Sequence, residues 1–275
     1  AFAILHTNGA PASGNAEGDG SMRCRITTTT MWCLATAWFV AQHVLAQDTL
    51  IAPRVGAAPA IDGEPDDWQL SLFTADAFFA LDGGNGNVNA GAIGDRDDYA
   101  TTTYVAYDDD MLYVLVVATD DAIESGFGPD NNWENDCVEL WIDGRDNDGV
   151  FPGEDDNVQV NVDVNGVPMV YRDAGGVKAA LLPEVLGGSI ETANGWIIET
   201  AIPLGIVPDT QLVAGGQIGF NISFVDSDDG VWNHLLWLGD QEVNTAQWGT
   251  LAFSSDTLAV DAAGKLATTW SELRR

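Results

Sequence analysis

Two stretches of alternating apolar and polar residues, at 137–143 and 158–164, form the clearest pattern in the chain. Side chains of a β-strand alternate between its two faces, so each stretch predicts a strand with one apolar side and one polar side. Paired as antiparallel neighbours, the two strands would place their polar side chains on one outward, solvent-facing surface. The side chains expected on that surface are Glu139, Trp141, Gln159 and Asn161. An indole beside amide and carboxylate groups is typical of a sugar-binding face, and an ordinary solvated sheet face is the alternative.

Further short apolar or alternating runs predict about ten strands in all, and no stretch has a sustained helical period. Residues 111–119 are apolar on both faces and predict a central strand. The other runs lie at 99–107, 169–172, 196–203, 219–226, 234–238 and 248–253. Turn residues separate these runs. The pattern therefore predicts an all-β fold, an antiparallel two-sheet β-sandwich of the jelly-roll or immunoglobulin-like kind.

The first residues have a different character. Residues 1–21 show no periodicity, whereas Met22 is followed by Arg23 and Arg25, an apolar run at 31–45 and small residues suited to cleavage near Ala46. This predicts a secretory signal peptide and a secreted protein, extracellular or periplasmic. The apolar run is too short and too interrupted for a membrane anchor, so no stable membrane span is expected after cleavage. The predicted organisation is upstream segment 1–21, signal peptide 22–46, short linker 47–54, sandwich domain 55–253 and C-terminal linker or next element 254–275.

After such a cleavage, Cys137 would be the remaining cysteine and His234 the remaining histidine. That inventory excludes an intrachain disulfide, a structural zinc site, a Cys-His nucleophile pair and a bis-histidine haem. No G-x-S-x-G motif supplies a serine nucleophile.

The chain is strongly acidic, with 42 Asp and Glu against 10 Lys and Arg, and a formal net charge of -32 over 275 residues. Nucleic acids and anionic membranes repel such a surface, so neither is an expected partner. Solubility of a secreted protein and calcium ligation both explain an acidic excess.

Calcium ligands are predicted where acidic residues cluster around a glycine turn, because calcium takes 6 to 8 oxygen ligands. The candidate ligands are Asp146, Asp148, Asp155 and Asp156. A second, weaker candidate group is Asp226, Asp228 and Asp229. The twelve-residue EF-hand pattern is absent, and a solvated acidic loop is the alternative.

Six blocks, in this order and spacing, resemble carbohydrate-binding module family 9 over roughly residues 55–253. The blocks are PAIDG (59–63) with DDW (66–68), YDDDMLYVLVVATDD (107–121), NWENDCVELWID (132–143), EDDNVQVNV (154–162), GWIIETAIP (195–203) and GFNISFVDSDDG (219–230). The resemblance implies a β-sandwich with bound calcium and a sugar site clamped by two indole rings.

Carried over by position, Trp133 matches one clamp aromatic, Glu139 a carboxylate that accepts sugar hydroxyls and Asn161 a polar ligand residue. Two positions depart from the pattern: Gln159 stands where the family has an arginine, and Ser223 where it has a glutamine-type contact. The second clamp tryptophan would fall in the loop 238–247, which has no aromatic residue.

The predicted function is a non-catalytic module that binds a plant-type polysaccharide such as xylan or cellulose, with a tethered glycan-degrading catalytic domain as the expected partner. One alternative is a glycoside hydrolase using a carboxylate pair such as Glu139 and Glu199. Another is a haem electron-transfer domain with His234 and either Met111 or Met169 as ligands.

Overall fold

A computed structural model describes residues 49–73, 76–78, 87–149, 151, 156–173, 176–207, 210, 212–228, 230–238 and 244–258. The predicted upstream segment 1–21 and signal peptide 22–46 lie outside these residues. So do residues 259–275 of the predicted C-terminal element. Within the described residues, none of the helices is long and apolar enough to cross a membrane.

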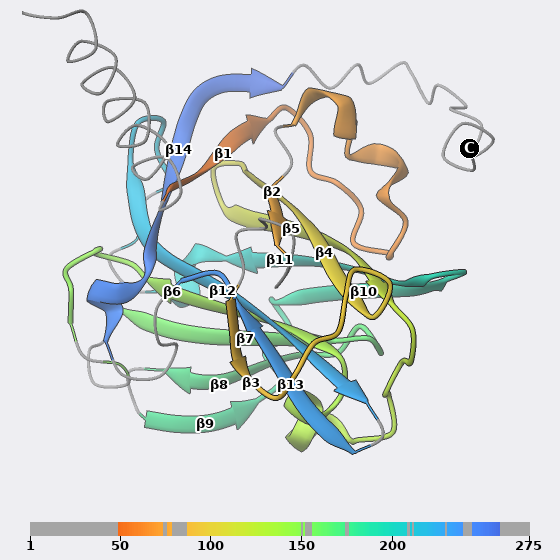
Figure 1. The fold of residues 1–275 in the computed structure, drawn as a ribbon. Helices are drawn as coiled ribbons and strands as arrows, with labels where there is room; N and C mark the ends of the chain where they lie inside the picture. The colour runs from red at the N-terminus through yellow and green to blue at the C-terminus, as the bar shows by residue number, and fades with distance from the viewer. Residues whose placement is uncertain are drawn as a thin grey trace, which may run out of the picture. The chain divides into compact units, whose positions relative to one another are not determined.

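The described residues form fourteen β-strands and five short 3₁₀ helices (Figure 1). The strands are β1 (Thr49–Val55), β2 (Asp76–Phe78), β3 (Asn87–Ala90), β4 (Tyr99–Tyr107), β5 (Met111–Asp120), β6 (Cys137–Asp143), β7 (Asn157–Asp163), β8 (Pro168–Asp173), β9 (Gly176–Ala180), β10 (Leu186–Thr192), β11 (Gly195–Pro203), β12 (Gln217–Asp228), β13 (Val231–Leu236) and β14 (Gly249–Leu258). The 3₁₀ helices are η1 (Pro65–Asp67), η2 (Leu70–Leu72), η3 (Pro129–Glu134), η4 (Leu204–Ile206) and η5 (Thr245–Gln247). The prediction of an all-β chain is confirmed.

All fourteen strands belong to one hydrogen-bonded sheet, which runs in the order β10-β11-β5-β4-β1-β14-β12-β6-β7-β8-β9. Strand β13 extends from β12, β3 from β13, and β2 pairs with β4. The predicted division into two separate sheets is not found in this hydrogen-bond pattern, because β1 pairs with both β4 and β14 and so joins the two halves. Both β1 pairings are parallel, whereas the other pairings are antiparallel.

Strand β1 corrects the predicted linker at 47–54, since residues 49–54 lie in the sheet. Leu50 and Ala52 are buried while their neighbours Thr49 and Ile51 are exposed, which is the alternation of a half-buried strand. An alternation this short does not stand out in the sequence beside an adjacent apolar segment.

The central prediction holds for strand pairing. β6 and β7 are antiparallel neighbours, with Glu139 opposite Asn161 and Trp141 opposite Gln159. β5 lies between β4 and β11, as its two apolar faces predicted.

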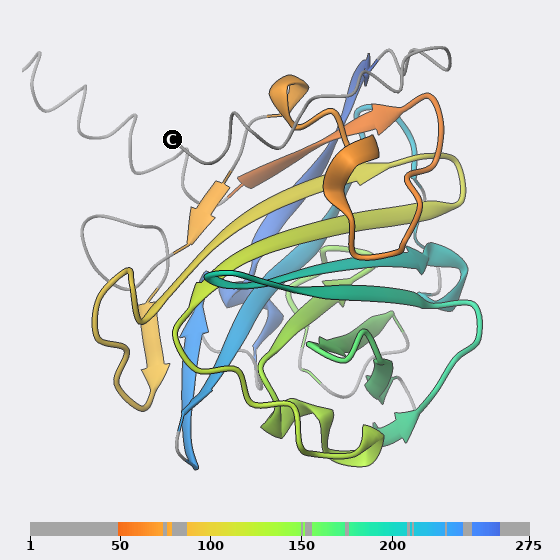
Figure 2. The ribbon, with the colours of Figure 1, turned by 90° about the vertical axis from the view of Figure 1, so that its right-hand side faces the viewer.

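The apolar sides of the two halves of the sheet pack into one large core. In Figure 2 the yellow strands β4 and β5 and the teal strands β10 and β11 cross over the blue strand β12. Side chains from both halves meet in this core: Val114, Val116, Trp196, Ile198, Leu140, Val160 and Ile222. Because these residues point inward, the alternate residues of β6, β7 and β12 share the other side of the sheet, where the candidate site lies.

Candidate functional site

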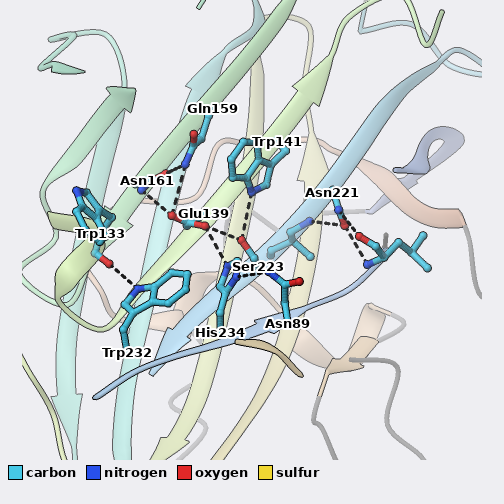
Figure 3. Close-up of polar contacts among 12 residues, drawn as sticks. Asn89, Trp133, Glu139, Trp141, Gln159, Asn161, Asn221, Ser223, Trp232 and His234 are labelled. Atoms are coloured by element: carbon cyan, nitrogen blue, oxygen red, sulfur yellow. Dashed lines mark hydrogen bonds and ion pairs between the residues drawn. The ribbon is translucent and has the colours of Figure 1, made fainter. Parts of the chain in front are cut away.

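Glu139 of β6 is the centre of a hydrogen-bond network on the polar side of the sheet (Figure 3). Asn161 of β7 donates from Nδ2 to Glu139 Oε1 at 3.0 Å. Ser223 of β12 donates from Oγ to Glu139 Oε2 at 2.9 Å. His234 Nε2 of β13 lies 3.2 Å from the same Oε2 atom. Strand β6 thus supplies the carboxylate, and β7, β12 and β13 each supply one group that contacts it.

The network continues to either side of Glu139. Gln159 donates from Nε2 to Asn161 Oδ1 at 2.9 Å, and Trp141 donates from Nε1 to Ser223 Oγ at 3.2 Å. Asn89 Nδ2 of β3 lies 3.4 Å from His234 Nδ1. Both ring nitrogens of His234 therefore have partners, and the imidazole is held in a fixed orientation.

The predicted exposure of this surface was wrong. Glu139 is 4 % exposed, Gln159 5 % and Asn161 0 %. Alternation along a strand specifies which side chains share a side, but it carries no information on whether more distant parts of the chain cover that side. Of the predicted sugar-contacting residues, Trp133 alone reaches the surface, at 38 % exposure.

Burial raises the pKa of the Glu139 carboxyl, but the hydrogen bond and charge of His234, together with the Ser223 and Asn161 hydrogen bonds, outweigh it. The net result is a pKa below the ordinary value, so Glu139 is ionised inside the protein. A buried carboxylate is tolerated here because its oxygens are bonded on both sides.

The exposed part of the site is a pocket of about 110 Å³ beside this network. Two indoles contribute to it. Trp232 of β13 stacks on His234 with ring centroids 4.7 Å apart, and its Nε1 donates to the Trp133 backbone oxygen at 3.2 Å. The pocket is lined by Glu124, Phe127, Trp133, Glu134, Ser227, Gly230, Val231 and Trp232. The contacts of Glu139 with His234 and of His234 with Trp232 link the buried network to this pocket (Figure 3).

Trp232 is the site residue that the sequence interpretation missed, because the second aromatic was sought only in the loop 238–247. One signal was available. Trp232 and His234 lie two positions apart in an alternating run, so they are expected to share a face of one strand.

A cluster of carboxylates includes Asp226, the neighbour in β12 of the pocket residue Ser227. Ligand oxygens of Asp120, Asp226 and Asp228 lie within 4.8 Å of one another, and so do those of Asp98, Asp121 and Asp228. Asp120 Oδ2 accepts a hydrogen bond from Trp196 Nε1 at 2.8 Å. Asp226 is fully buried, and its Oδ1 atom has no hydrogen-bond partner. An orphaned, buried carboxylate oxygen among other carboxylates is the kind of ligand that a divalent cation requires.

Asp136, the residue before β6, lies close enough to this cluster for the charges of Asp120 and Asp226 to act on it. Burial, with the nearby charge of Asp120 as the next cause, raises the pKa of Asp136 to about 9. Burial and the neighbouring Asp228 and Asp120 carboxylates raise the pKa of Asp226 to about 8. The pKa values of Asp136 and Asp226 thus shift in the opposite direction to that of Glu139, because their charged neighbours are also carboxylates.

Asp226 and Asp228 of the second predicted calcium group lie in this carboxylate cluster, whereas Asp146 and Asp156 of the first group have other contacts. Asp146 and Asp148 adopt left-handed backbone conformations with φ of 51° and 58°. Asp146 Oδ2 accepts a hydrogen bond from Gln217, and buried Asp156 forms an ion pair with Arg145 at 3.3 Å. Asp155 and Asp229 lie outside the described residues. Among the residues described, the groups of three carboxylates whose oxygens all lie within 4.8 Å of one another are Asp120 with Asp226 and Asp228, and Asp98 with Asp121 and Asp228.

The residues named for the two alternative functions have partners of other kinds. Glu199 of β11 accepts hydrogen bonds from the backbone nitrogens of Asp62 and Gly63, at 3.0 and 2.8 Å. It therefore anchors the segment before η1 and has no contact with the Glu139 network among these bonds. Met111 packs with the small core cluster around Trp68, and Met169 is buried opposite Asn161.

Comparisons with known proteins agree on one family. The family model described as "Carbohydrate family 9 binding domain-like" matches residues 84–255. No curated protein matches the chain significantly.

Three solved structures share the fold. A family 9 carbohydrate-binding module from Caldicellulosiruptor kristjanssonii in complex with cellotriose has a TM-score of 0.57 and 17% identity, and the match covers 74% of this chain and 94% of that one. A family 9 module from the same organism in complex with glucose has a TM-score of 0.58 and 16% identity, and the match covers 75% of this chain and 95% of that one. A proposed carbohydrate-binding protein from Bacteroides uniformis has a TM-score of 0.56 and 14% identity, and the match covers 75% of this chain and 99% of that one.

Proposed function

The chain belongs to the carbohydrate family 9 binding domain-like family, and from this premise we propose that it is a non-catalytic module that binds sugars in the pocket between Trp133 and Trp232. The observation that carries the proposal is the continuous connection from buried Glu139 through His234 to the Trp232 indole at the pocket. A binding site of this kind needs an aromatic surface that is both accessible and rigidly held.

The pocket chemistry suits a sugar ring. Trp133 and Phe127 are 38 % and 41 % exposed and offer apolar surface to the C–H face of a pyranose. Glu124 and Glu134 line the same pocket, and ionised carboxylates accept hydrogen bonds from hydroxyl groups. A neutral, hydroxyl-rich ligand also avoids the repulsion that this acidic chain imposes on anions.

Glu139, Gln159 and Asn161 have a different role in this proposal from the one predicted for them. All three are buried and bonded to one another, so they support the pocket from beneath. His234 transmits that support, because it is bonded to Glu139 on one side and stacked on Trp232 on the other.

Cello-oligosaccharides are the first ligands to test, since the similar Caldicellulosiruptor kristjanssonii structures hold cellotriose and glucose. Xylo-oligosaccharides are the second, following the predicted xylan or cellulose specificity. Isothermal titration calorimetry should give saturable binding to one of the two series. Trp133→Ala and Trp232→Ala should each weaken it about tenfold, which corresponds to the ~1.4 kcal/mol expected for losing an aromatic stack with its buried area.

The matched control is Leu181→Ala, which removes an exposed apolar side chain that does not line the pocket. Leu181→Ala should bind as the wild type does. Unchanged binding by both tryptophan variants would place the sugar elsewhere and would refute the pocket.

A bound calcium ion is part of the proposal, with Asp120, Asp226 and Asp228 as its ligands. Three carboxylates within 4.8 Å of one another, one of them with an orphaned buried oxygen, fit the oxygen-rich coordination of calcium. The alternative ligands Asp146, Asp148, Asp155 and Asp156 stay a prediction. Calcium titration of Asp226→Asn and Asp148→Asn separates the two locations, because only one substitution should abolish binding.

Secretion and association with a glycan-degrading catalytic domain complete the proposal. They are supported by the basic and apolar pattern of residues 22–46 and by family membership. Expression of the chain with its predicted signal peptide, followed by N-terminal sequencing of the exported protein, should find a start near Gln47. Retention of the intact chain inside the cell would contradict it.

A further inference from the structure

Resting on the proposed carbohydrate site, we propose that Asp136 is a positioning residue that couples sugar affinity in the Trp133 pocket to a divalent cation bound by Asp120, Asp226 and Asp228. Asp136 does not line the pocket. It acts through the backbone of two residues that do.

Asp136 is fully buried and uses both carboxylate oxygens on backbone amides. Its Oδ2 accepts a hydrogen bond from the Glu124 nitrogen at 2.8 Å, and its Oδ1 accepts one from the Ser227 nitrogen at 2.7 Å. Glu124 and Ser227 both line the pocket. One side chain therefore ties together two pocket walls that are 103 residues apart in the sequence.

The backbone of Asp136 strengthens the same connection. Its nitrogen donates to the Glu124 oxygen at 3.0 Å, and its oxygen accepts from the Val164 nitrogen at 2.9 Å. Glu124 is thus held at both its nitrogen and its oxygen by one residue. A change in the position of Asp136 must move the Glu124 wall with it.

The cation cluster lies on the same segments. Asp120 is the last residue of β5, four positions before Glu124, and Asp226 directly precedes Ser227 in β12. Asp120 and Asp226 both lie close enough to Asp136 for their charges to raise its pKa. Carboxylates at this spacing repel one another when ionised, and a divalent cation reverses the sign of the force between the segments that carry them.

A cation would therefore hold the end of β5 and the end of β12 in the arrangement that the structure shows, in which Asp136 reaches both amides. Ser227 also pairs with Trp232 across β12 and β13, so the same restraint helps to position the Trp232 indole. The cation and the sugar favour the same arrangement of the pocket walls. Each must then raise the affinity for the other by the same factor.

Calorimetry with two probes tests this reciprocity on the full chain after chelator treatment. Cellotriose is titrated with and without calcium chloride at about 100 times the calcium Kd, and calcium is titrated with and without saturating cellotriose. We expect calcium to tighten cellotriose binding at least about fivefold, and cellotriose to tighten calcium binding by the same factor. Equal cellotriose affinities in the two conditions, with near-UV circular dichroism showing both forms folded, would overturn the coupling.

The variant Asp136→Asn isolates the positioning role. It keeps the shape of the side chain but faces one of the two backbone N–H groups with an amide donor instead of an acceptor. We expect calcium and cellotriose still to bind, with the coupling factor reduced to about one. The control is Asp130→Asn, an exposed acid in η3 outside the pocket lining, which should keep the wild-type factor. A wild-type factor in Asp136→Asn would overturn the assignment.

Hydrogen exchange separates failure of the coupling from failure of the sugar site. If cellotriose does not bind under any condition, the proposed carbohydrate function fails, and amide exchange at Glu124 and Ser227 decides the role of Asp136. Calcium should slow exchange at both amides in the wild type and at neither in Asp136→Asn. Exchange that is unaffected by calcium in the wild type would overturn the inference by itself, and this readout does not require the variant to fold.

Discussion

Two buried acidic regions of this protein differ in the groups that surround their carboxylates. At Glu139, the chain supplies a histidine, a hydroxyl and an amide to a single carboxylate, and the carboxyl pKa falls below its ordinary value. At Asp120, Asp136 and Asp226, the chain brings carboxylates together, and their pKa values rise. The first region is complete within the protein, whereas the second has the composition of a site completed by an external cation. The pocket has contacts to both, through Trp232 stacked on His234 and through the Glu124 and Ser227 amides bonded to Asp136.

The largest expected effect comes from removing the internal partner of Glu139. His234→Ala removes the ion-pair partner of the buried Glu139 carboxylate and leaves it with the Ser223 and Asn161 hydrogen bonds alone, so the free energy of unfolding should fall by about 3–5 kcal/mol. Urea denaturation followed by circular dichroism measures the change. The double variant Glu139→Gln/His234→Ala should recover part of the loss, because it no longer buries an unpaired charge. An equal loss in the single and double variants would attribute the effect to lost packing on Trp232.

Chelation tests the second region. Calcium at 100 times its Kd should stabilise the folded chain by about 2.7 kcal/mol, and a chelator should remove that gain. Thermal unfolding with and without calcium gives the difference. Asp226→Asn should abolish the calcium-dependent part, while Glu139→Gln should leave it intact, since that carboxylate has its partners inside the protein. Calcium dependence of equal size in Asp226→Asn would show that the ion binds elsewhere.

Glu199 is a third buried carboxylate to compare with Glu139, because it accepts hydrogen bonds from two backbone amides and has no histidine partner among these bonds. Burial outweighs those hydrogen bonds and raises its pKa from 4.5 to about 7. The folded state therefore holds the proton more tightly than the unfolded state, and stability from this group is full below pH 4.5 and lost as pH rises through about 7. Glu199→Gln should remove a pH-dependent loss of about 2 kcal/mol across that window, after allowance for solvent screening. Parallel stability curves for the variant and the wild type would contradict it.

The smallest effect is expected at Glu139 itself, as a function of pH. Its depressed pKa means that its stabilisation is present above the ordinary value of 4.5 and is lost as pH falls through the folded-state value. Glu139→Gln should therefore cost about 1.5 kcal/mol at pH 7 and progressively less in acid. Denaturant titrations at pH 7, 5 and 3 measure the cost. A cost that grows on acidification would reverse the assigned sign of the pKa change.

The sequence predicted the local part of this structure well. Alternation predicted β6 and β7 and the shared polar side of Glu139, Asn161 and Gln159, because strand periodicity is written directly into adjacent residues. It also marked β5 as central, since that strand is apolar on both faces. These inferences need no knowledge of distant segments.

The parts that sequence could not predict all depend on contacts between remote segments. The polar side of β6 is buried, and the carboxylate cluster combines Asp120 of β5 with Asp226 of β12. Acidic residues that are neighbours in sequence, such as Asp146 and Asp148, gave a stronger pattern than these distant ones. Proximity along the chain is visible in a sequence, whereas proximity across a sheet requires the sheet order to be known.

The parallel strand β1 has a consequence for how the chain reaches this fold. Its partner β14 lies at the other end of the domain, with Thr49 opposite Thr250. Loop closure over such a separation is slow and entropically costly, so the pairing is expected late in folding. During synthesis, β1 emerges from the ribosome first and must wait, with an unpaired edge, until nearly the whole domain has been translated.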